Sequence, residues 1–187
     1  MTDTVWNHAR TEIRLAGEGG QGMILAGIIL AEAAAIYDGL NVVQSQSYGP
    51  EARGGASKSE VIISREEIDF PEVIQADILI TLSQEACDKY SSQLSKGGLL
   101  ILDTDNVQVF PTSESVKLPI TTLAVNTTGR AITANTVALG ILVALTGVVS
   151  QNAITKAVAS RAPKGTQKMN LAALNAGFKA VQELQTG

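Results

Sequence analysis

Short apolar runs and longer helical runs alternate along the first part of the chain. Residues 12–16 form a short apolar segment, residues 23–37 are apolar on nearly every side, and residues 41–46 form another short segment. This order predicts strand, helix, strand. Further strands are expected at residues 58–64, 77–81 and 99–102, a helix at 84–93, and edge strands at 107–110 and 116–118 beside Pro111 and Pro119.

The last third of the chain has a helical pattern. Helices are expected at residues 133–146, 150–160 and 166–184, and the last one places Leu171, Leu174, Phe178 and Val181 on one face. The whole pattern predicts the α/β class, as a Rossmann-like three-layer domain with a mostly parallel sheet and a helical C-terminal part. No linker divides the chain, so residues 1–187 are expected to form a single domain, with residues 1–10 as a flexible arm.

Composition excludes several classes of function. The formal charge is −4 and the basic residues are scattered, which argues against a nucleic-acid partner. The longest apolar run, from Val137 to Leu145, is shorter than the ~20 residues that span a bilayer, and the N-terminus does not resemble a signal peptide. We therefore expect a cytoplasmic protein without a membrane contact. One cysteine and one histidine predict no metal site in this chain, and Cys87 is expected to be a small apolar residue of a helix.

A glycine-rich turn follows the first predicted strand. Gly17, Gly19 and Gly22 match the pattern G-x-G-x-x-G between a strand and a helix, where exposed N–H groups at the helix start attract an anion. The candidate anion contacts of this turn are Gly17, Gly19, Gly20, Gln21 and Gly22. The alternative is that the glycines only allow the helix and strand to pack closely.

The dinucleotide version of this motif needs one more residue. An acid should end the second strand, about 20 residues on, to hold a ribose. The chain has Gln44-Ser45-Gln46 at that place, and Glu18 inside the turn would repel an anion if it pointed inward. Both features argue against NAD binding.

A second specialised segment follows the second predicted strand. In a parallel sheet it should emerge at the same edge as the glycine turn, where ligands and partners collect. Arg53 suits a phosphate or carboxylate because its planar group can donate two parallel hydrogen bonds. The alternative is a Glu51–Arg53 contact that only shapes the loop. The residues expected to contact a partner subunit or an active site are Tyr48, Gly49, Glu51, Arg53, Gly54 and Gly55.

The two glycine-containing segments together resemble the gamma subunits of the 2-oxoacid:ferredoxin oxidoreductases, most closely the 2-oxoglutarate member. The resemblance is carried by the segments 17–22, 44–56, 59–64, 83–86, 134–140 and 163–166, and it covers nearly the whole chain after about Glu12. The pyruvate, 2-oxoisovalerate and indolepyruvate members look similar enough to remain alternatives for the substrate.

The resemblance implies a reaction and a division of labour. A 2-oxoacid is oxidatively decarboxylated with coenzyme A to an acyl-CoA and carbon dioxide, and ferredoxin is reduced. Thiamine diphosphate, magnesium and iron–sulfur clusters are implied in the other subunits, namely alpha, beta and a ferredoxin-like chain, and no catalytic residue in this one. The isolated chain is then expected to be inactive, with Arg53 and the glycine turn as possible CoA contacts. An independent NAD-linked Rossmann dehydrogenase and a non-redox binding or scaffold domain are the alternatives.

Overall fold

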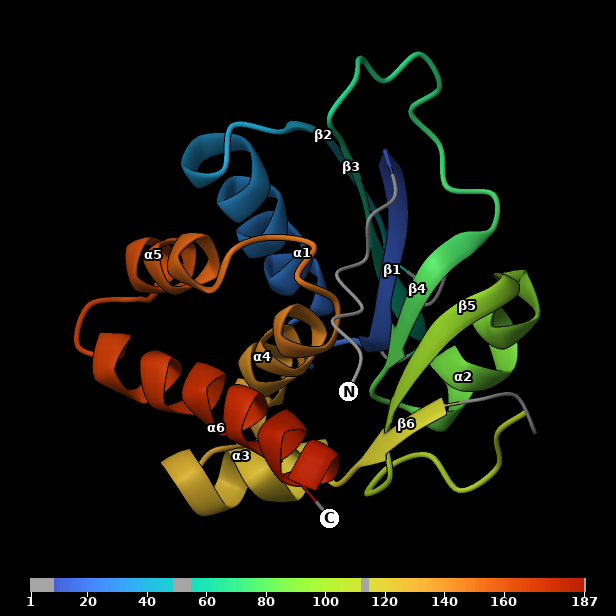
Figure 1. The fold of residues 1–187 in the computed structure, drawn as a ribbon. Helices are drawn as coiled ribbons and strands as arrows, with labels where there is room; N and C mark the ends of the chain where they lie inside the picture. The colour runs from blue at the N-terminus through green and yellow to red at the C-terminus, as the bar shows by residue number, and fades with distance from the viewer. Residues whose placement is uncertain (1–8, 49–54, 112–114, 187) are drawn as a thin grey trace.

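The computed structural model describes residues 9–48, 55–111 and 115–186 (Figure 1). Within them the chain forms one sheet in the order β2-β3-β1-β4-β5-β6. Its strands are β1 (Arg10–Glu18), β2 (Asn41–Ser47), β3 (Ala56–Ser64), β4 (Ala76–Thr81), β5 (Leu94–Asp103) and β6 (Ser115–Leu118). Because Arg10 already belongs to β1, the expected N-terminal arm ends before it, and residues 1–8 lie outside the described residues.

The sheet is mostly parallel, as predicted, with one reversed strand. β1 pairs in parallel with β4, β4 with β5, and β5 with β6, whereas β3 runs antiparallel to both of its neighbours, β1 and β2. β2 therefore points in the same direction as β1 although β3 separates them. Gly17 pairs with Ser57 and Ser47 with Lys58, so the ends of β1 and β2 lie at one edge, on either side of the start of β3.

Helices cover both faces of the sheet, which gives the predicted three layers (Figure 1). α2 (Gln84–Tyr90) lies on one side. On the other side lie α1 (Met23–Glu32), which continues as a π-helical turn (Ala33–Tyr37), α3 (Ile120–Thr128), α4 (Ala134–Thr146), α5 (Gln151–Arg161) and α6 (Gln167–Thr186). Gly39 has a left-handed backbone (φ 68°) just after this first helical segment, and the Ser150 hydroxyl accepts the Ala153 N–H at the start of α5.

The helical side is built around α4, which is buried along almost its whole length. α6 crosses α4 at two glycines that leave no room for a side chain. A Cβ on Gly177 would lie 2.2 Å from the Val137 carbonyl oxygen, and one on Gly140 would lie 2.3 Å from the Leu174 carbonyl oxygen. The two backbones can approach this closely only because both positions are glycine.

The α2 side of the sheet contains a buried ion pair. Arg14 is 1% exposed, and its guanidinium lies 2.6 Å from the Glu60 carboxylate and also donates to the Val73 carbonyl oxygen at 3.0 Å and to Gln93. Its charge is therefore compensated and its donors are satisfied, the condition for burying an arginine without a large penalty.

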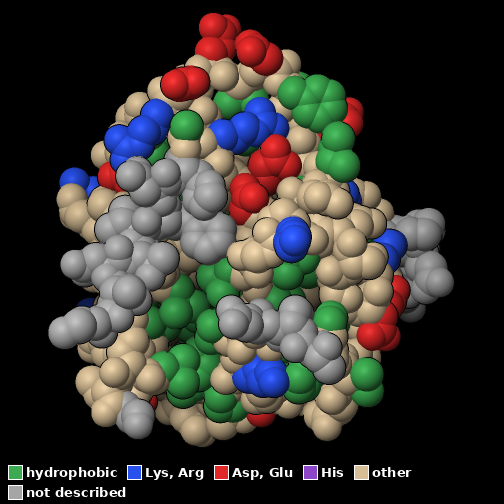
Figure 2. All heavy atoms as spheres, turned by 45° about the vertical axis from the view of Figure 1, so that its right-hand side comes forward, with side chains coloured by type: hydrophobic (Ala, Val, Ile, Leu, Met, Phe, Trp, Pro, Cys, Tyr) green, Lys and Arg blue, Asp and Glu red, His purple; other side chains and the backbone are tan. Residues whose placement is uncertain are grey.

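Charged side chains are present at the amino ends of the parallel strands. β1 begins at the top of Figure 1, where Arg10 and Glu12 form an ion pair at 2.8 Å and the Asp77 carboxylate accepts the Glu12 N–H. Charged side chains gather in the same upper region of the neighbouring face, while hydrophobic side chains line a hollow lower down (Figure 2). An ion pair thus lies at the amino end of β1, away from the glycine turn.

Two segments differ from the sequence prediction. Residues 107–110 are not a strand, because the Gln84 side chain accepts the N–H groups of Gln108 and Val109 and donates to the Val109 carbonyl oxygen. α3 was not predicted. Its first turn is held by Asp103, the last residue of β5, and by Asp105: Asp103 accepts from Thr121, and Asp105 accepts from the backbone and the hydroxyl of Thr122.

Candidate functional site

The glycine turn is held together by one amide side chain. Gln21 accepts the Glu18 N–H through its Oε1 at 2.7 Å and donates from its Nε2 to the Leu82 carbonyl oxygen at 2.9 Å. The backbone closes the same turn, since the Gln21 N–H donates to the Glu18 carbonyl oxygen at 3.1 Å. Gln21 therefore ties the turn to the end of β4 through both atoms of its amide.

The glycines of the turn fall into two pairs. A Cβ on Gly17 would lie 2.5 Å from Gln21 Oε1, and a Cβ on Gly22, which has a left-handed backbone (φ 76°), would lie 2.5 Å from Asn135 Nδ2. The close-packing explanation therefore accounts for these two positions. A Cβ on Gly19 or Gly20 would meet no atom of the described residues within 4 Å, so these two glycines face open space in this part of the structure.

The open side of the turn is part of a pocket of about 350 Å³ at the carboxyl edge of the sheet. The pocket brings the turn together with the first residues of α1, the end of β2 and the start of β3. It is lined by Gly19, Gly20, Gly22, Met23, Ile24, Leu25, Ile28, Tyr48 and Ser57. The expected convergence of the glycine turn with the segment after β2 is thus present at Tyr48, whose side chain is 70% exposed.

The chemistry of this pocket combines backbone donors with an apolar wall. The first N–H groups of α1 have no partner inside the helix, and we find no acceptor for those of Met23, Ile24 and Leu25 among the described residues. The helix dipole favours a negative group there. Glu18 is exposed and is not inserted into the turn. Apart from the glycines, the side chains that line the pocket are largely aliphatic. Such a pocket suits a ligand with an anionic group and an apolar segment.

Several predicted loop residues cannot be placed. Gly49, Glu51, Arg53 and Gly54 lie outside the described residues. Gly55 is described and has a left-handed backbone (φ 86°), and the N–H of the next residue, Ala56, donates to Glu85 at 3.0 Å.

The strand order removes the geometry of a dinucleotide site. In such a site the ribose-binding acid ends the parallel strand next to β1. On that side the neighbour of β1 is the antiparallel β3, and β2, one strand further out, ends in Gln46 and Ser47. The acid of β3, Glu60, is engaged with Arg14 and Lys58.

Metal-binding and nucleophilic side chains do not gather in the described part of the chain. No group of three His, Cys, Asp or Glu residues there could hold a metal ion. Cys87 is buried on α2, and desolvation raises the pKa of its thiol, although a hydrogen bond with Thr81 acts in the opposite direction. A buried thiol with a raised pKa is a poor nucleophile.

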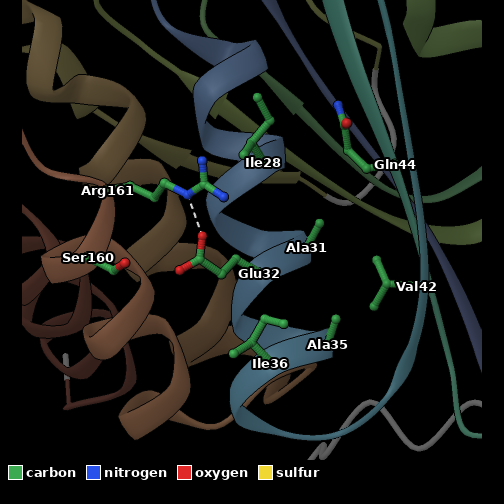
Figure 3. A pocket seen from close by; sticks show the side chains of 9 residues that line it. All are labelled: Ile28, Ala31, Glu32, Ala35, Ile36, Val42, Gln44, Ser160 and Arg161. Carbon is green, nitrogen blue, oxygen red and sulfur yellow. Dashed lines mark hydrogen bonds and ion pairs between the residues drawn. The ribbon is translucent and has the colours of Figure 1, made fainter.

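A larger groove, of about 710 Å³, runs between the outer side of α1, β2 and the end of α5 (Figure 3). Its two charged groups neutralise each other, because the Arg161 guanidinium donates to the Glu32 carboxylate. Gln44, on the opposite wall, donates to Ser59 at 2.9 Å. Three of the polar side chains that line the groove, Glu32, Arg161 and Gln44, are thus already engaged within the chain, and we place the candidate site at the glycine turn instead.

Sequence reasoning missed the apolar wall of the site. The helix after the turn was expected to be buried on most sides, yet Leu25 is 41% exposed and Ile28 is only half-buried. Their continuity with Tyr48 depends on the position of β2, which periodicity does not reveal.

None of the helices in the described residues is long and apolar enough to cross a membrane.

The comparisons with known proteins agree with this fold. Residues 12–180 match the model of the family described as pyruvate ferredoxin/flavodoxin oxidoreductase. The chain is 51% identical to a 2-oxoglutarate synthase subunit, KorC, of Methanocaldococcus jannaschii, over 94% of this chain and 96% of that protein. It superposes with a TM-score of 0.86 on a keto/oxoacid ferredoxin oxidoreductase gamma subunit of Geobacter sulfurreducens, at 53% identity, covering 94% of this chain and 98% of that one.

A more distant relative has a different length. The ketoisovalerate oxidoreductase subunit VorA of Methanothermobacter marburgensis is 36% identical over 137 residues, which are 71% of this chain and only 28% of VorA. In VorA, therefore, the matching domain is covalently joined to a larger amount of additional protein.

Proposed function

This chain belongs to the pyruvate ferredoxin/flavodoxin oxidoreductase family, and we propose that it is the gamma subunit of a cytoplasmic, heteromeric 2-oxoglutarate:ferredoxin oxidoreductase. The observation that carries the proposal is the 51% identity to a 2-oxoglutarate synthase subunit over nearly the full length of both chains. A related subunit of a keto/oxoacid ferredoxin oxidoreductase has the same fold.

The reaction of the complex transfers two electrons. The bond between the carboxylate and the keto carbon of the 2-oxoacid breaks, the acyl carbon forms a thioester with CoA, carbon dioxide and a proton leave, and two ferredoxins each accept one electron. Thiamine diphosphate with magnesium supplies the decarboxylation chemistry, and iron–sulfur clusters carry the electrons. We assign these groups to the other subunits. Among the described residues of this chain, no group of His, Cys, Asp or Glu side chains could hold a metal ion, and Cys87 is a buried free thiol.

The partners of the chain are then the alpha and beta subunits, which bind thiamine diphosphate, and a ferredoxin-like subunit. The length of VorA supports an association with further polypeptides, because there a matching domain is covalently joined to additional protein. The loop formed by Tyr48, Gly49, Glu51, Arg53, Gly54 and Gly55 is our candidate for contact with a partner or with its active site.

The role that we assign to this subunit is to bind CoA at the carboxyl edge of its sheet. Gly19, Gly20 and the first N–H groups of α1 offer donors to a phosphate, and the aliphatic wall formed by Leu25 and Ile28 suits an apolar segment of the same ligand. Gly17, Gln21 and Gly22 shape the turn. Arg53 is the proposed second anion contact.

The function is tested by reconstitution. Co-expression with the thiamine-binding and ferredoxin-like subunits should give a complex that reduces ferredoxin only when both 2-oxoglutarate and CoA are present, with lower kcat/KM for pyruvate and 2-oxoisovalerate. The chain purified alone should be colourless and inactive. Turnover by the isolated chain with NAD would instead support an independent dehydrogenase. Failure to bind any of these subunits would support a scaffold role outside redox chemistry.

The CoA contact is tested separately with arginine variants of the complex. Arg53→Ala should raise KM for CoA about tenfold, the loss of one charge-assisted contact, and leave KM for 2-oxoglutarate unchanged. Arg65→Ala is the matched control, because Arg65 is an exposed arginine just beyond the other end of β3. An unchanged KM for CoA in the Arg53 variant would exclude this contact.

A further inference from the structure

Three segments far apart in the sequence meet behind the glycine turn. Asn135 Nδ2, at the start of α4, donates to the Gly22 carbonyl oxygen at 3.0 Å. The Thr136 hydroxyl lies between two amide oxygens, 3.2 Å from that of Asn135 and 3.4 Å from that of Asn170 on α6. Asn170 Nδ2 in turn donates to Thr166, to its carbonyl oxygen at 3.0 Å and its hydroxyl at 3.1 Å.

This chain of polar contacts is buried at the end next to the turn. Asn135 is 5% exposed and Thr136 is 2% exposed. The Asn135 amide also occupies the space where a side chain on Gly22 would point. A buried hydrogen bond of this kind is costly to leave unmade, so it fixes the orientation of the groups that it joins.

The contact with Gly22 sets the direction of a neighbouring donor. The Gly22 carbonyl oxygen accepts both from Asn135 and from the Ala26 N–H at 3.0 Å. A trans peptide unit is planar, and its C=O and N–H groups point in opposite directions. Because Asn135 and Ala26 hold the Gly22 C=O, they also aim the Met23 N–H away from it, and Met23 is one of the residues that line the pocket.

We propose that Asn135 is a positioning residue for CoA binding, which orients the donors at the start of α1 and is itself oriented by Thr136 and Asn170. The proposal rests on the proposed function, in which this turn contacts CoA. It explains why the segments 17–22, 134–140 and 163–166, which all carry the family resemblance, belong to one site: together with Asn170 they form a line of polar contacts from Thr166 to Gly22, in which the single Thr136 O–H donates to one of the two amide oxygens at a time.

The test compares two buried polar residues of α4 in the assembled complex. Asn135→Asp keeps the shape but places a carboxylate oxygen, which cannot donate, against the Gly22 carbonyl oxygen. Thr146→Val is the matched control, because Thr146 is also fully buried but its hydroxyl bonds only to backbone at the other end of the helix. Asn135→Asp should raise KM for CoA about tenfold and leave kcat and KM for 2-oxoglutarate within about twofold. Thr146→Val should change none of the three.

A second variant and a second measurement distinguish a specific effect on CoA binding from a general loss of stability. Thr136→Val removes only the hydroxyl that orients Asn135, and should raise KM for CoA by about threefold. Hydrogen exchange of the complex should be faster at the N–H groups of residues 22–25 in both variants, and unchanged there in Thr146→Val. Equal effects of the Asn135 and Thr146 variants on KM for CoA would show a general loss of stability and overturn the proposal.

One further variant separates this proposal from the CoA site on which it depends. Gly19→Val adds a side chain whose Cβ meets no described atom within 4 Å, on the open side of the turn. If Gly19→Val raises KM for CoA and Asn135→Asp does not, the positioning role is wrong and the site stands. If neither variant changes KM for CoA, both are wrong. If the wild-type complex oxidises 2-oxoglutarate without CoA, the proposed function itself fails.

Discussion

Glycines serve different purposes at the α4–α6 crossing and in the turn after β1. At the crossing, Gly140 and Gly177 face backbone atoms of the opposing helix at distances that no Cβ could tolerate. In the turn, Gly17 and Gly22 are explained in a similar way by Gln21 and Asn135, but a Cβ on Gly19 or Gly20 would contact none of the residues that the structure describes. Gly20 still needs its left-handed backbone (φ 99°), whereas Gly19 does not have one.

The comparison gives a criterion for interpreting a glycine-rich motif. A glycine that the chain itself crowds, or whose backbone is left-handed, is required for folding. A glycine that meets neither condition is not required by the described structure, and Gly19 is such a residue. Its small size then points to something outside the described residues, which the proposed function identifies as CoA. Three substitutions, in order of decreasing effect on stability, test this distinction.

The largest effect is expected at the helix crossing. Gly177→Val would press its side chain against the backbone of Val137, Gly140 and Ile141, which cannot move without separating the helices. We expect it to lower the free energy of unfolding by about 3 kcal/mol or more, measured by urea denaturation of the purified subunit. Asn175→Ala is the control, because Asn175 is exposed on the same helix and should change stability by no more than about 0.5 kcal/mol.

An intermediate effect is expected at Gly22. Alanine in this left-handed conformation costs about 1–2 kcal/mol, and its methyl group would also displace the Asn135 amide. Gly22→Ala should therefore lower both the stability of the subunit and the affinity of the complex for CoA. Thermal unfolding and KM for CoA measure the two effects. If Gly22→Ala had normal stability, the turn would be able to accommodate the added methyl group. That result would contradict the criterion that a crowded or left-handed glycine is required for folding.

The smallest effect on stability is expected at Gly19. Gly19→Ala adds a methyl group in open space with an ordinary backbone conformation, so the free energy of unfolding should change by no more than about 0.5 kcal/mol. The criterion then predicts a raised KM for CoA in the complex in spite of the normal stability. A clear loss of stability would mean that Gly19 belongs to the same class as Gly177.

Much of the fold could be predicted from periodicity, because most elements bury their own apolar side chains. The last helix is an example, since Leu174, Phe178 and Val181 are buried as the spacing indicates. α3 escaped prediction because four of its nine residues are threonines, which are poor helix formers, and its first turn depends on Asp103 and Asp105, 17–18 residues away. The wrong strand at residues 107–110 has a similar cause: Gln84, 24–25 residues away, takes up its N–H groups.

The candidate site was predictable only in part. The turn is a local motif, and its meeting with the end of β2 follows from the direction of the strands. The sequence also suggests that Asn135, in an apolar helix, needs a hydrogen-bond partner. It cannot show that the partner is Gly22, 113 residues away, because this contact exists only once α4 has packed against the start of α1. The orientation of β3, which separates β2 from β1, has no signature in the pattern either.

The groups that shape the turn share a chemical property with a practical consequence. Gln21, Asn135, Thr136 and Asn170 carry amides and a hydroxyl, none of which gains or loses a proton near neutrality. Acidifying the medium or adding salt leaves these hydrogen bonds intact, unlike contacts between charged side chains. A pH dependence of CoA binding is therefore not expected to originate in these four side chains.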